Sequence, residues 1–349
     1  MSYELGVMQD KIKFGVVGCG HIGKRHIEMI QRNPEAELMA VCDILPTAIP
    51  SSVAALPSFN SLDSLISSKI AFDVLNICTP NGLHAPMAIR GLETGHSVVI
   101  EKPMALNTKD AQAILDTAEK YDKKVFCVMQ NRYSPPSVWI KDVIDNQLFG
   151  RIFMVQINCY WNRDERYYHT GGWHGTKDLD GGTLFTQFSH FIDLMYWLFG
   201  DITNIKARFA DFNHQHLTAF EDSGVVSFDF KNGGIGVFNY STSVYDVNLE
   251  SSVTIIGEKG SVKIGGQYMN EVEYCRIKDY TMPQLPPTNP GNDYGTYKGS
   301  AQNHHYVIDN VVNVLKNKAG EKITTNAQEG YKVVDIIERI YREKNNLPF

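Results

Sequence analysis

The sequence predicts a mixed α/β chain that folds as two domains. Up to about residue 130, apolar strand-like runs alternate with helix-like segments, which is typical of a doubly wound parallel sheet. Beyond residue 150, strand-like runs follow one another across short turns rich in glycine and asparagine, which favours an α+β domain with a mostly antiparallel open sheet. We therefore expect domains at 1–130 and 131–349, and 349 residues suffice for two cores.

The first strand–helix–strand unit organises the parallel sheet. Residues 11–18 form an apolar run that suits a buried strand, and the turn Gly18-Cys19-Gly20-His21-Ile22-Gly23 follows it. A helical pattern then leads to a second apolar strand at 38–42, which ends in Asp43. This order and spacing are those of the Rossmann dinucleotide-binding fingerprint, whereas a glycine-rich turn alone would only connect a strand to a helix.

Each part of this fingerprint has a mechanical reason. Gly18 allows a tight turn, Gly20 lets backbone N–H groups approach a pyrophosphate, and Gly23 lets the helix pack closely on the strand. The diphosphate would lie at the positive end of the helix dipole. Asp43 would accept hydrogen bonds from ribose hydroxyls and repel a 2′-phosphate, so the expected cofactor is NAD rather than NADP.

Three more strands continue the parallel pattern, and polar residues follow each of them. The strands expected at 73–78, 96–100 and 124–129 stop at Thr79, at Glu101-Lys102 and at Gln130-Asn131, respectively. Because ligands bind at the carboxyl ends of parallel strands, these residues should line one crevice. Helices are expected at 62–67, 85–94 and 109–121, the last with Thr108 as its N-cap.

The second domain shows a different pattern. Strands are expected at 151–161, 202–212, 224–230, 236–242, 252–256 and 271–277, followed by a loop at 282–300 and helices at 302–316 and 326–344, the latter opened by a capping box of Thr325 and Gln328. An open sheet leaves one broad face to be covered. We expect a homo-oligomer, a dimer or tetramer through this sheet, although helices of the same chain would cover the face equally well.

The composition excludes several classes of partner. A net charge of −6 without a basic run gives no reason to expect nucleic acid or an anionic membrane. Residues 1–10 lack the apolar region of a secretory signal, and the most apolar stretch, 185–199, is too short to span a bilayer. The six cysteines are scattered, which favours free thiols in the cytoplasm. His214 with His216, and His304 with His305, lack further ligands at metal-site spacing, so no metal is expected.

Two residues are candidates for catalysis. Lys102 follows a buried strand at the expected ligand edge, where an ammonium would stabilise an alkoxide or take part in proton transfer. His190 lies in the apolar segment 181–193 and would suit a general base. As one helix from Thr183, this segment places its polar residues in a single stripe, which either a ligand pocket or neighbouring backbone would satisfy: 183, 186, 187, 190 and 193.

The run at 161–168 ends a strand and is rich in planar donors. Arg163 or Arg166 would grip a carboxylate or diphosphate bidentately, or would form a surface ion-pair cluster. His169 and His174 flank a loop and would contact either ligand or solvent.

Taken together, these segments resemble the Gfo/Idh/MocA oxidoreductases over essentially the whole chain. The resemblance rests on the turn at 18–23, on Thr79-Pro80-Asn81 with His84, on Glu101-Lys102-Pro103, and on Gly181-Gly182 followed by His190 and Asp193. It implies NAD(P)-dependent oxidation of a sugar or cyclitol hydroxyl, with Lys102 and His190 at the reacting carbon. Many members place Asp or Asn four residues before that histidine, whereas this chain has Thr186, which leaves Thr186, Gln187 or Asp193 to orient His190.

Within that family, the segments 130–133, 161–163, 173–176 and 186–190 are most similar to the enzymes that oxidise the 3-hydroxyl of UDP-N-acetylglucosaminuronate for surface polysaccharide synthesis. A dehydrogenase of a free sugar or inositol, an NAD-dependent glycosidase and a non-enzymatic NAD sensor are the alternatives. The expected NAD site comprises Gly18, Gly20, His21, Ile22, Gly23, Asp43, Ile44, Thr79, Pro80, Asn81, His84, Glu101, Lys102, Gln130 and Trp173. The expected substrate site comprises Lys102, Asn131, Trp161, Asn162, Arg163, Tyr168, Gln187 and His190.

Overall fold

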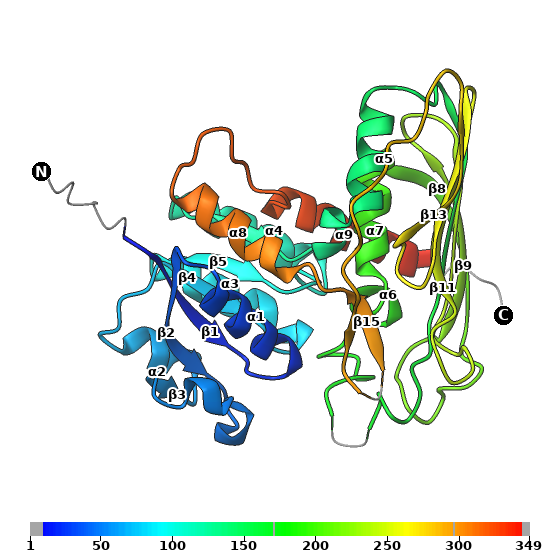
Figure 1. Cartoon of the computed structure of the whole chain (residues 1–349). Helices are drawn as coiled ribbons and strands as arrows, with labels where there is room; N and C mark the ends of the chain where they lie inside the picture. The colour runs from blue at the N-terminus through cyan, green and yellow to red at the C-terminus, as the bar shows by residue number, and fades with distance from the viewer. Residues whose placement is uncertain (1–9, 170–171, 296, 344–349) are drawn as a thin grey trace, which may run out of the picture.

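The computed structural model describes residues 10–169, 172–295 and 297–343. It confirms a parallel sheet followed by a mostly antiparallel one (Figure 1). The first sheet has the order β3-β2-β1-β4-β5-β6, and all its strand pairs are parallel. Its strands are β1 (Ile12–Val17), β2 (Ala36–Cys42), β3 (Ser58–Phe59), β4 (Val74–Ile77), β5 (Ser97–Ile100) and β6 (Val125–Cys127).

Helices cover both faces of this sheet. The helices of this region are α1 (His21–Arg32), α2 (Leu62–Ser67), α3 (His84–Glu93) and α4 (Thr108–Lys120). The expected helices at 62–67, 85–94 and 109–121 are therefore confirmed, but the expected cap of the last one is wrong. Asn107, not Thr108, accepts the N–H of Asp110, because an asparagine carbonyl reaches that position as well as a threonine hydroxyl does.

The second sheet has seven strands in the order β13-β12-β11-β7-β10-β9-β8. Only the pair of β10 and β7 is parallel among its described pairs. The sequence reasoning missed β12, which follows β11 across a tight turn. The strands are β7 (Ile152–Tyr160), β8 (Ile202–Ala210), β9 (Ser223–Phe230), β10 (Ile235–Ser241), β11 (Glu250–Gly257), β12 (Gly260–Gly265) and β13 (Glu271–Ile277).

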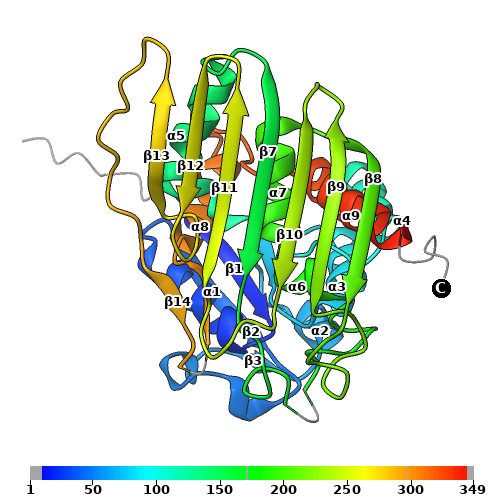
Figure 2. The same cartoon turned by 90° about the vertical axis from the view of Figure 1, so that its right-hand side faces the viewer.

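One face of this sheet is covered by helices and the other is open. Figure 2 shows the open face turned to the viewer, with the helices behind it. Strand residues alternate accordingly: Val226 and Phe228 of β9 are buried, whereas Val225 is 54% exposed and Ile235 of β10 is 55% exposed. The covering helices include α5 (Pro135–Asp145), α7 (Ser189–Phe199) and α9 (Ala327–Arg342), of which α5 was not expected.

The C-terminal part of the chain returns to the first domain. The apolar residues Val307, Ile308 and Val311 of α8 (His304–Leu315) lie in one core with Phe14 and Ile27 of the first β-α unit. The boundary at residues 130 and 131 stays a prediction. The capping box of α9 is confirmed in kind but is shifted by one residue, since Asn326 and Glu329 form it.

Two details near the expected site differ from the sequence reasoning. The segment at 183–193 is not one helix: α6 (Thr183–Thr186) ends before Gln187, and α7 begins at Ser189. The expected loop at 282–300 contains a two-stranded hairpin, β14 (Gly291–Asp293) with β15 (Lys298–Ala301).

Candidate active site

The glycine turn between β1 and α1 has the geometry that a diphosphate site needs. Gly18 has a φ of +85°, and a Cβ there would lie 2.6 Å from the Cys78 carbonyl oxygen. A Cβ on Gly23 would overlap the Gly18 carbonyl oxygen, whereas a Cβ on Gly20 would meet nothing within 4 Å. Gly18 and Gly23 therefore hold the strand, turn and helix together. Gly20 leaves open space at the N-terminus of α1, as the approach of a pyrophosphate requires.

Asp43 lies at the end of β2 and faces this turn. Its Oδ2 accepts the Cys19 N–H at 2.7 Å, and its Oδ1 accepts the Leu45 N–H at 2.8 Å. The next residue, Ile44, is 80% exposed and offers an apolar side chain at the same edge. His21 and Ile22 begin α1, and the His21 ring lies 5.5 Å from that of Tyr294 in the hairpin segment.

The residues after β4 connect the cofactor edge to the second domain. His84 is buried between the carbonyl oxygens of Thr79, at 2.8 Å, and Pro103, at 2.7 Å, and burial lowers its pKa. The Asn81 side-chain amide donates to the Asp180 carbonyl oxygen at 2.8 Å and to Thr186 Oγ1 at 2.7 Å. The Thr79-Pro80-Asn81 segment thus holds the loop that precedes α6.

Lys102 points from the end of β5 toward α6. Its Nζ donates to the Thr186 carbonyl oxygen at 2.6 Å. Burial lowers the pKa of Lys102, and the carboxylates of Glu101 and Asp180 oppose this shift. The ammonium is therefore held by one backbone acceptor beyond the carboxyl end of β5, and its place in a ligand site stays a prediction.

His190 is buried in the first turn of α7. Its Nε2 lies 3.3 Å from the Gln130 side-chain nitrogen, and its Nδ1 has no hydrogen-bond partner among the described residues. Burial, and then the positive charge of Lys102, hold the pKa of His190 well below its usual value. The imidazole is thus neutral at physiological pH. Because an amide nitrogen only donates, Nε2 accepts from Gln130 and the ring proton lies on Nδ1, so Nε2 is the nitrogen that can accept a proton when a ligand hydroxyl replaces the Gln130 amide. Gln130, at the end of β6, is its protein partner.

The polar residues of 183–193 do not form one stripe around a ligand. Gln187 accepts a hydrogen bond from Arg163, and its amide donates to Tyr167. Asp193 forms a buried ion pair with Arg132, at 2.6 Å. The break between α6 and α7 directs these side chains to separate partners. Gln187 and Asp193 therefore bond to residues other than His190. A role for either residue in orienting the His190 imidazole is not supported.

The wall of the second domain is densely packed. Trp161 donates to Ser251 Oγ at 2.8 Å, and Asn162 donates to the Val244 carbonyl oxygen at 2.7 Å. Tyr168 packs against Tyr167 with ring centroids 4.9 Å apart. Trp173 stacks on His174 at 3.9 Å between ring centroids. Arg166 instead pairs at the surface with Asp164 and Asp246, as the surface alternative foresaw.

Arg163 is the most unusual residue of this wall. Its guanidinium is 2% exposed and lies over the rings of Trp161, Tyr167 and Tyr297. Its described hydrogen-bond acceptors are all neutral: Gln187, Asn248 and the carbonyl oxygens of Asn162 and Lys298. These acceptors occupy donors that a bidentate grip would need. Arg163 is therefore a buried cation without a carboxylate among its described hydrogen-bond partners.

Buried polar atoms without hydrogen-bond partners lie at and beside the contact between Gln130 and His190. Among the described residues they include Gln130 Oε1, Asn131 Oδ1 and His190 Nδ1. Asn131 Nδ2 reaches only Ser300 Oγ of the hairpin, at 3.5 Å. Buried polar atoms are rarely left unpaired in a native protein, so these atoms fit a site that binds polar ligand groups.

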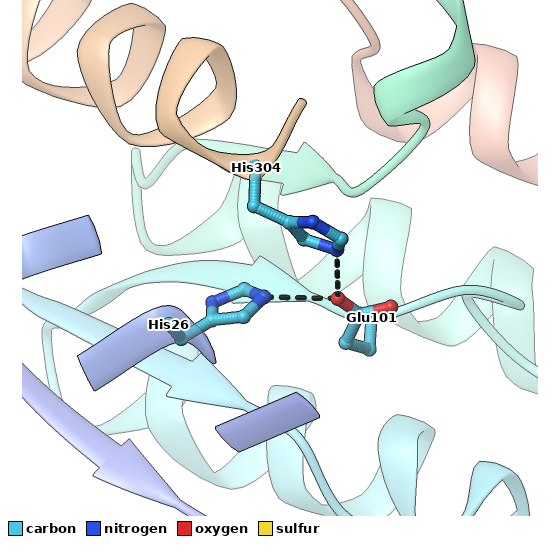
Figure 3. A group of neighbouring side chains, drawn as sticks. All are labelled: His26, Glu101 and His304. Atoms are coloured by element: carbon cyan, nitrogen blue, oxygen red, sulfur yellow. Dashed lines mark hydrogen bonds and ion pairs between the residues drawn. The ribbon is translucent and has the colours of Figure 1, made fainter. Parts of the chain in front are cut away.

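The sequence reasoning missed a buried group around Glu101 (Figure 3). His26 Nε2 lies 2.9 Å from Glu101 Oε1, and His304 Nε2 lies 3.6 Å from the same oxygen. Two imidazoles and a carboxylate are a donor set that a metal accepts. However, the Asn76 amide donates to His26 Nδ1 at 2.9 Å, which leaves the His26 proton on Nε2 to bond Glu101. In this arrangement hydrogen bonds tie His26 of α1 to Asn76 and to Glu101 after β5, and His304 of α8 lies at ion-pair distance from the same carboxylate.

The fold and the site together define a class of protein: a two-domain NAD-dependent oxidoreductase acting on an alcohol group. Residues 12–129 match the model of the oxidoreductase family with an NAD-binding Rossmann fold, and residues 138–263 match that of the GFO/IDH/MocA C-terminal domain. The chain belongs to the Gfo/Idh/MocA family, as the resemblance had indicated.

Solved structures and curated relatives support the same assignment. The WlbA dehydrogenase of Bordetella pertussis, solved with NADH and UDP-GlcNAcA, is 33% identical, with a TM-score of 0.85, over 97% of this chain and 99% of that one. That of Chromobacterium violaceum, in the same kind of complex, is 31% identical, with a TM-score of 0.85, over 98% of each chain. The inositol 2-dehydrogenase of Rhizobium meliloti is 25% identical over 78% of this chain and 82% of its own length.

Within the described residues, no helix is both long enough and apolar enough to cross a membrane.

Proposed function

We propose that this protein oxidises the 3-hydroxyl of UDP-N-acetylglucosaminuronate to a ketone, with NAD as the hydride acceptor, in the synthesis of a surface polysaccharide. The observation that carries the proposal is the pair of cations in the crevice. Lys102 and the buried Arg163, which has no carboxylate among its described partners, make the crevice favourable for an anionic sugar. The likeness to WlbA dehydrogenases solved with UDP-GlcNAcA supports this substrate over a neutral one.

In this proposal the residues divide the chemistry between them. The neutral His190 takes the hydroxyl proton on Nε2, where the substrate hydroxyl replaces the Gln130 amide, and the Lys102 ammonium stabilises the negative charge that develops on the oxygen. NAD, when bound, accepts the hydride. The glycine turn and Asp43 hold the cofactor, with Ile44, Thr79, His84, Glu101, Gln130 and Trp173 around it. Asn131, Trp161, Asn162, Arg163, Tyr168 and Gln187 form the substrate wall.

The test is NADH formation on a matched panel of substrates. UDP-N-acetylglucosaminuronate, UDP-N-acetylglucosamine (which lacks only the sugar carboxylate), free glucuronate and myo-inositol are each added to the enzyme at stoichiometric NAD. We expect NADH with the first and at least about 100-fold lower kcat/KM with UDP-N-acetylglucosamine, because the two cations lose the sugar carboxylate that would balance their charge. Faster oxidation of myo-inositol would assign the alternative function, which the inositol 2-dehydrogenase relatives favour.

We also propose that the chain assembles through the open face of the second sheet. The described residues exposed there include Phe153, Val225 and Ile235, which are apolar and 45 to 55% exposed. A second copy of the same sheet would bury them and give a dimer or a tetramer. The free cysteines, five of them buried, agree with the proposed cytoplasmic location.

The oligomer is tested by the single change Ile235→Lys. A lysine in the middle of the apolar face would leave a charge without a partner in the interface, so light scattering should show a smaller particle. The exposed Tyr245→Lys, in the loop after β10, is the matched control and should leave the mass unchanged. A wild-type protein that is already monomeric would contradict the proposal.

A further inference from the structure

Asp180 is a buried carboxylate beside the site that the sequence did not single out. It is 1% exposed and lies in the loop that leads into α6. Its Oδ2 accepts the Gly175 N–H at 2.7 Å, and its Oδ1 contacts the Thr186 hydroxyl. The Thr186 hydroxyl is also close to the Asp180 carbonyl oxygen, at 3.0 Å. The Asp180 carboxylate therefore anchors the Thr186 hydroxyl, with the Asp180 backbone carbonyl oxygen beside it.

Thr186 is in turn the residue that holds the Lys102 ammonium. Its carbonyl oxygen accepts from Lys102 Nζ at 2.6 Å, and its hydroxyl also accepts the Asn81 amide, at 2.7 Å. Lys102 has no carboxylate within ion-pair distance among its described contacts, although Asp180 and Glu101 both act on its charge. The chain of contacts thus runs from the Asp180 carboxylate through Thr186 to the ammonium.

We propose that Asp180 is a positioning residue for catalysis: its carboxylate, acting through Thr186, fixes the Lys102 ammonium in the crevice and favours its charged form. The expected effect of Asp180 on turnover rests on the proposed function, whereas its expected effect on the Lys102 ammonium does not. Without Asp180, Thr186 would lose one of its two side-chain anchors, and Lys102 would lose a negative charge that compensates its burial.

The surroundings of Asp180 make its charge sensitive to pH. Besides Lys102, the ionisable groups near the Asp180 carboxylate include the phenols of Tyr167, Tyr168 and Tyr341. These phenols are neutral at physiological pH, so Lys102 is the charged group among them. Burial raises the pKa of Asp180 to about 6, against the hydrogen bonds from Thr186 and Gly175. Asp180 is therefore mostly ionised above pH 6 and loses its charge as the pH falls through that value.

The alternative is that Asp180 only closes the loop, through the Gly175 N–H. The two roles differ in what they do to Lys102. A residue that only closes the loop would change the stability of the fold and leave the pKa of Lys102 where it was. A positioning residue would also change the acid–base behaviour of Lys102.

The experiment compares the variants Asp180→Asn, Thr186→Val and Thr186→Ser with the control Asp222→Asn. The control removes a different buried carboxylate, which accepts the N–H groups of Phe212 and Asn213. The first readout needs neither substrate nor cofactor. Competitive acetylation with acetic anhydride, followed by peptide mass spectrometry, gives the pKa of Lys102 in each variant. We expect Asp180→Asn to lower it by about one unit, because an opposite charge is lost, and Asp222→Asn to leave it unchanged.

The second readout is turnover on the best substrate of the panel. Asp180→Asn should lower kcat by about 10- to 100-fold, change KM for NAD by less than about threefold, and move the alkaline limb of the kcat–pH profile to lower pH. Thr186→Val should also lower kcat, and Thr186→Ser, which keeps the hydroxyl, should restore it. An unchanged pKa of Lys102 in Asp180→Asn would overturn the proposal, whether or not any substrate is found. A lowered pKa with no substrate oxidised would contradict only the proposed function.

Discussion

The glycine turn at 18–23 and the segment at 180–193 both line the crevice, but they obtain their geometry in different ways. The turn is set by its own residues: Gly18 and Gly23 touch backbone within the same β-α-β unit or in the neighbouring strand. The later segment is set by distant partners, since Lys102 and Asn81 hold Thr186, and Arg132 holds Asp193. One part of the site is therefore formed by residues that are close in the sequence, and the other part depends on contacts between distant segments of the chain.

The largest expected effect is at the end of the later segment. His190→Asn keeps a polar side chain but removes the proton acceptor, so turnover should fall by about two to four orders of magnitude. NAD binding should be unchanged, because the close contacts of Gly18 and Gly23 involve no residue of the later segment. Steady-state kinetics and NAD titration by tryptophan fluorescence measure the two effects separately.

The control for this variant is His216→Asn, whose side chain is 67% exposed and belongs to neither region. It should match the wild type in both measurements. Wild-type turnover in His190→Asn would remove His190 from the mechanism, and a joint loss of NAD binding would show that the two regions are not independent.

The same contrast explains what the sequence predicted. The strand ends with Gly18, Asp43, Thr79, Lys102 and Gln130 were found because short apolar runs and turn residues specify a parallel sheet locally. Asp180 and the buried pair of His26 and His304 were missed, because a single residue in a loop or on a helix has no periodic signal. Only the fold brings them to Thr186 and Glu101.

The break between α6 and α7 shows the same limit. The polar residues of 183–193 follow helical spacing, so the pattern favoured one continuous helix. In the structure Gln187 turns to Arg163, which lies at the end of a strand 24 residues earlier. Contacts of this kind override local periodicity, and they were not visible in the pattern.

A smaller effect would test the local character of the glycine turn. Gly20→Ala adds a Cβ that meets nothing within 4 Å, and the weaker helix cap that alanine makes is offset by the lower entropy of the unfolded chain, so the free energy of unfolding without NAD should change by less than about 1 kcal/mol. The added methyl group would, however, occupy the space through which a pyrophosphate approaches. We expect Kd for NAD, measured by calorimetry, to rise by about 10- to 100-fold.

Gly23→Ala is the matched comparison within the same turn. Its Cβ would overlap the Gly18 carbonyl oxygen, so this variant should lose stability, by about 1–3 kcal/mol in denaturant unfolding, as well as NAD affinity. Equal stability losses in the two variants would refute the distinct roles assigned to these glycines.

The smallest expected effect concerns the choice of cofactor. Asp43 accepts the Cys19 and Leu45 N–H groups and presents its negative charge at the edge where the adenosine ribose is expected. Asp43→Asn removes the charge that would repel a 2′-phosphate, so the ratio of kcat/KM for NAD to that for NADP should fall by about tenfold. Asp63→Asn, at an exposed carboxylate paired with Arg90, should leave the ratio unchanged. Asp43 lies at the end of the second strand of the β-α-β unit. An unaltered ratio of kcat/KM for NAD to that for NADP in Asp43→Asn would therefore mean that the cofactor preference is set by contacts from outside this unit.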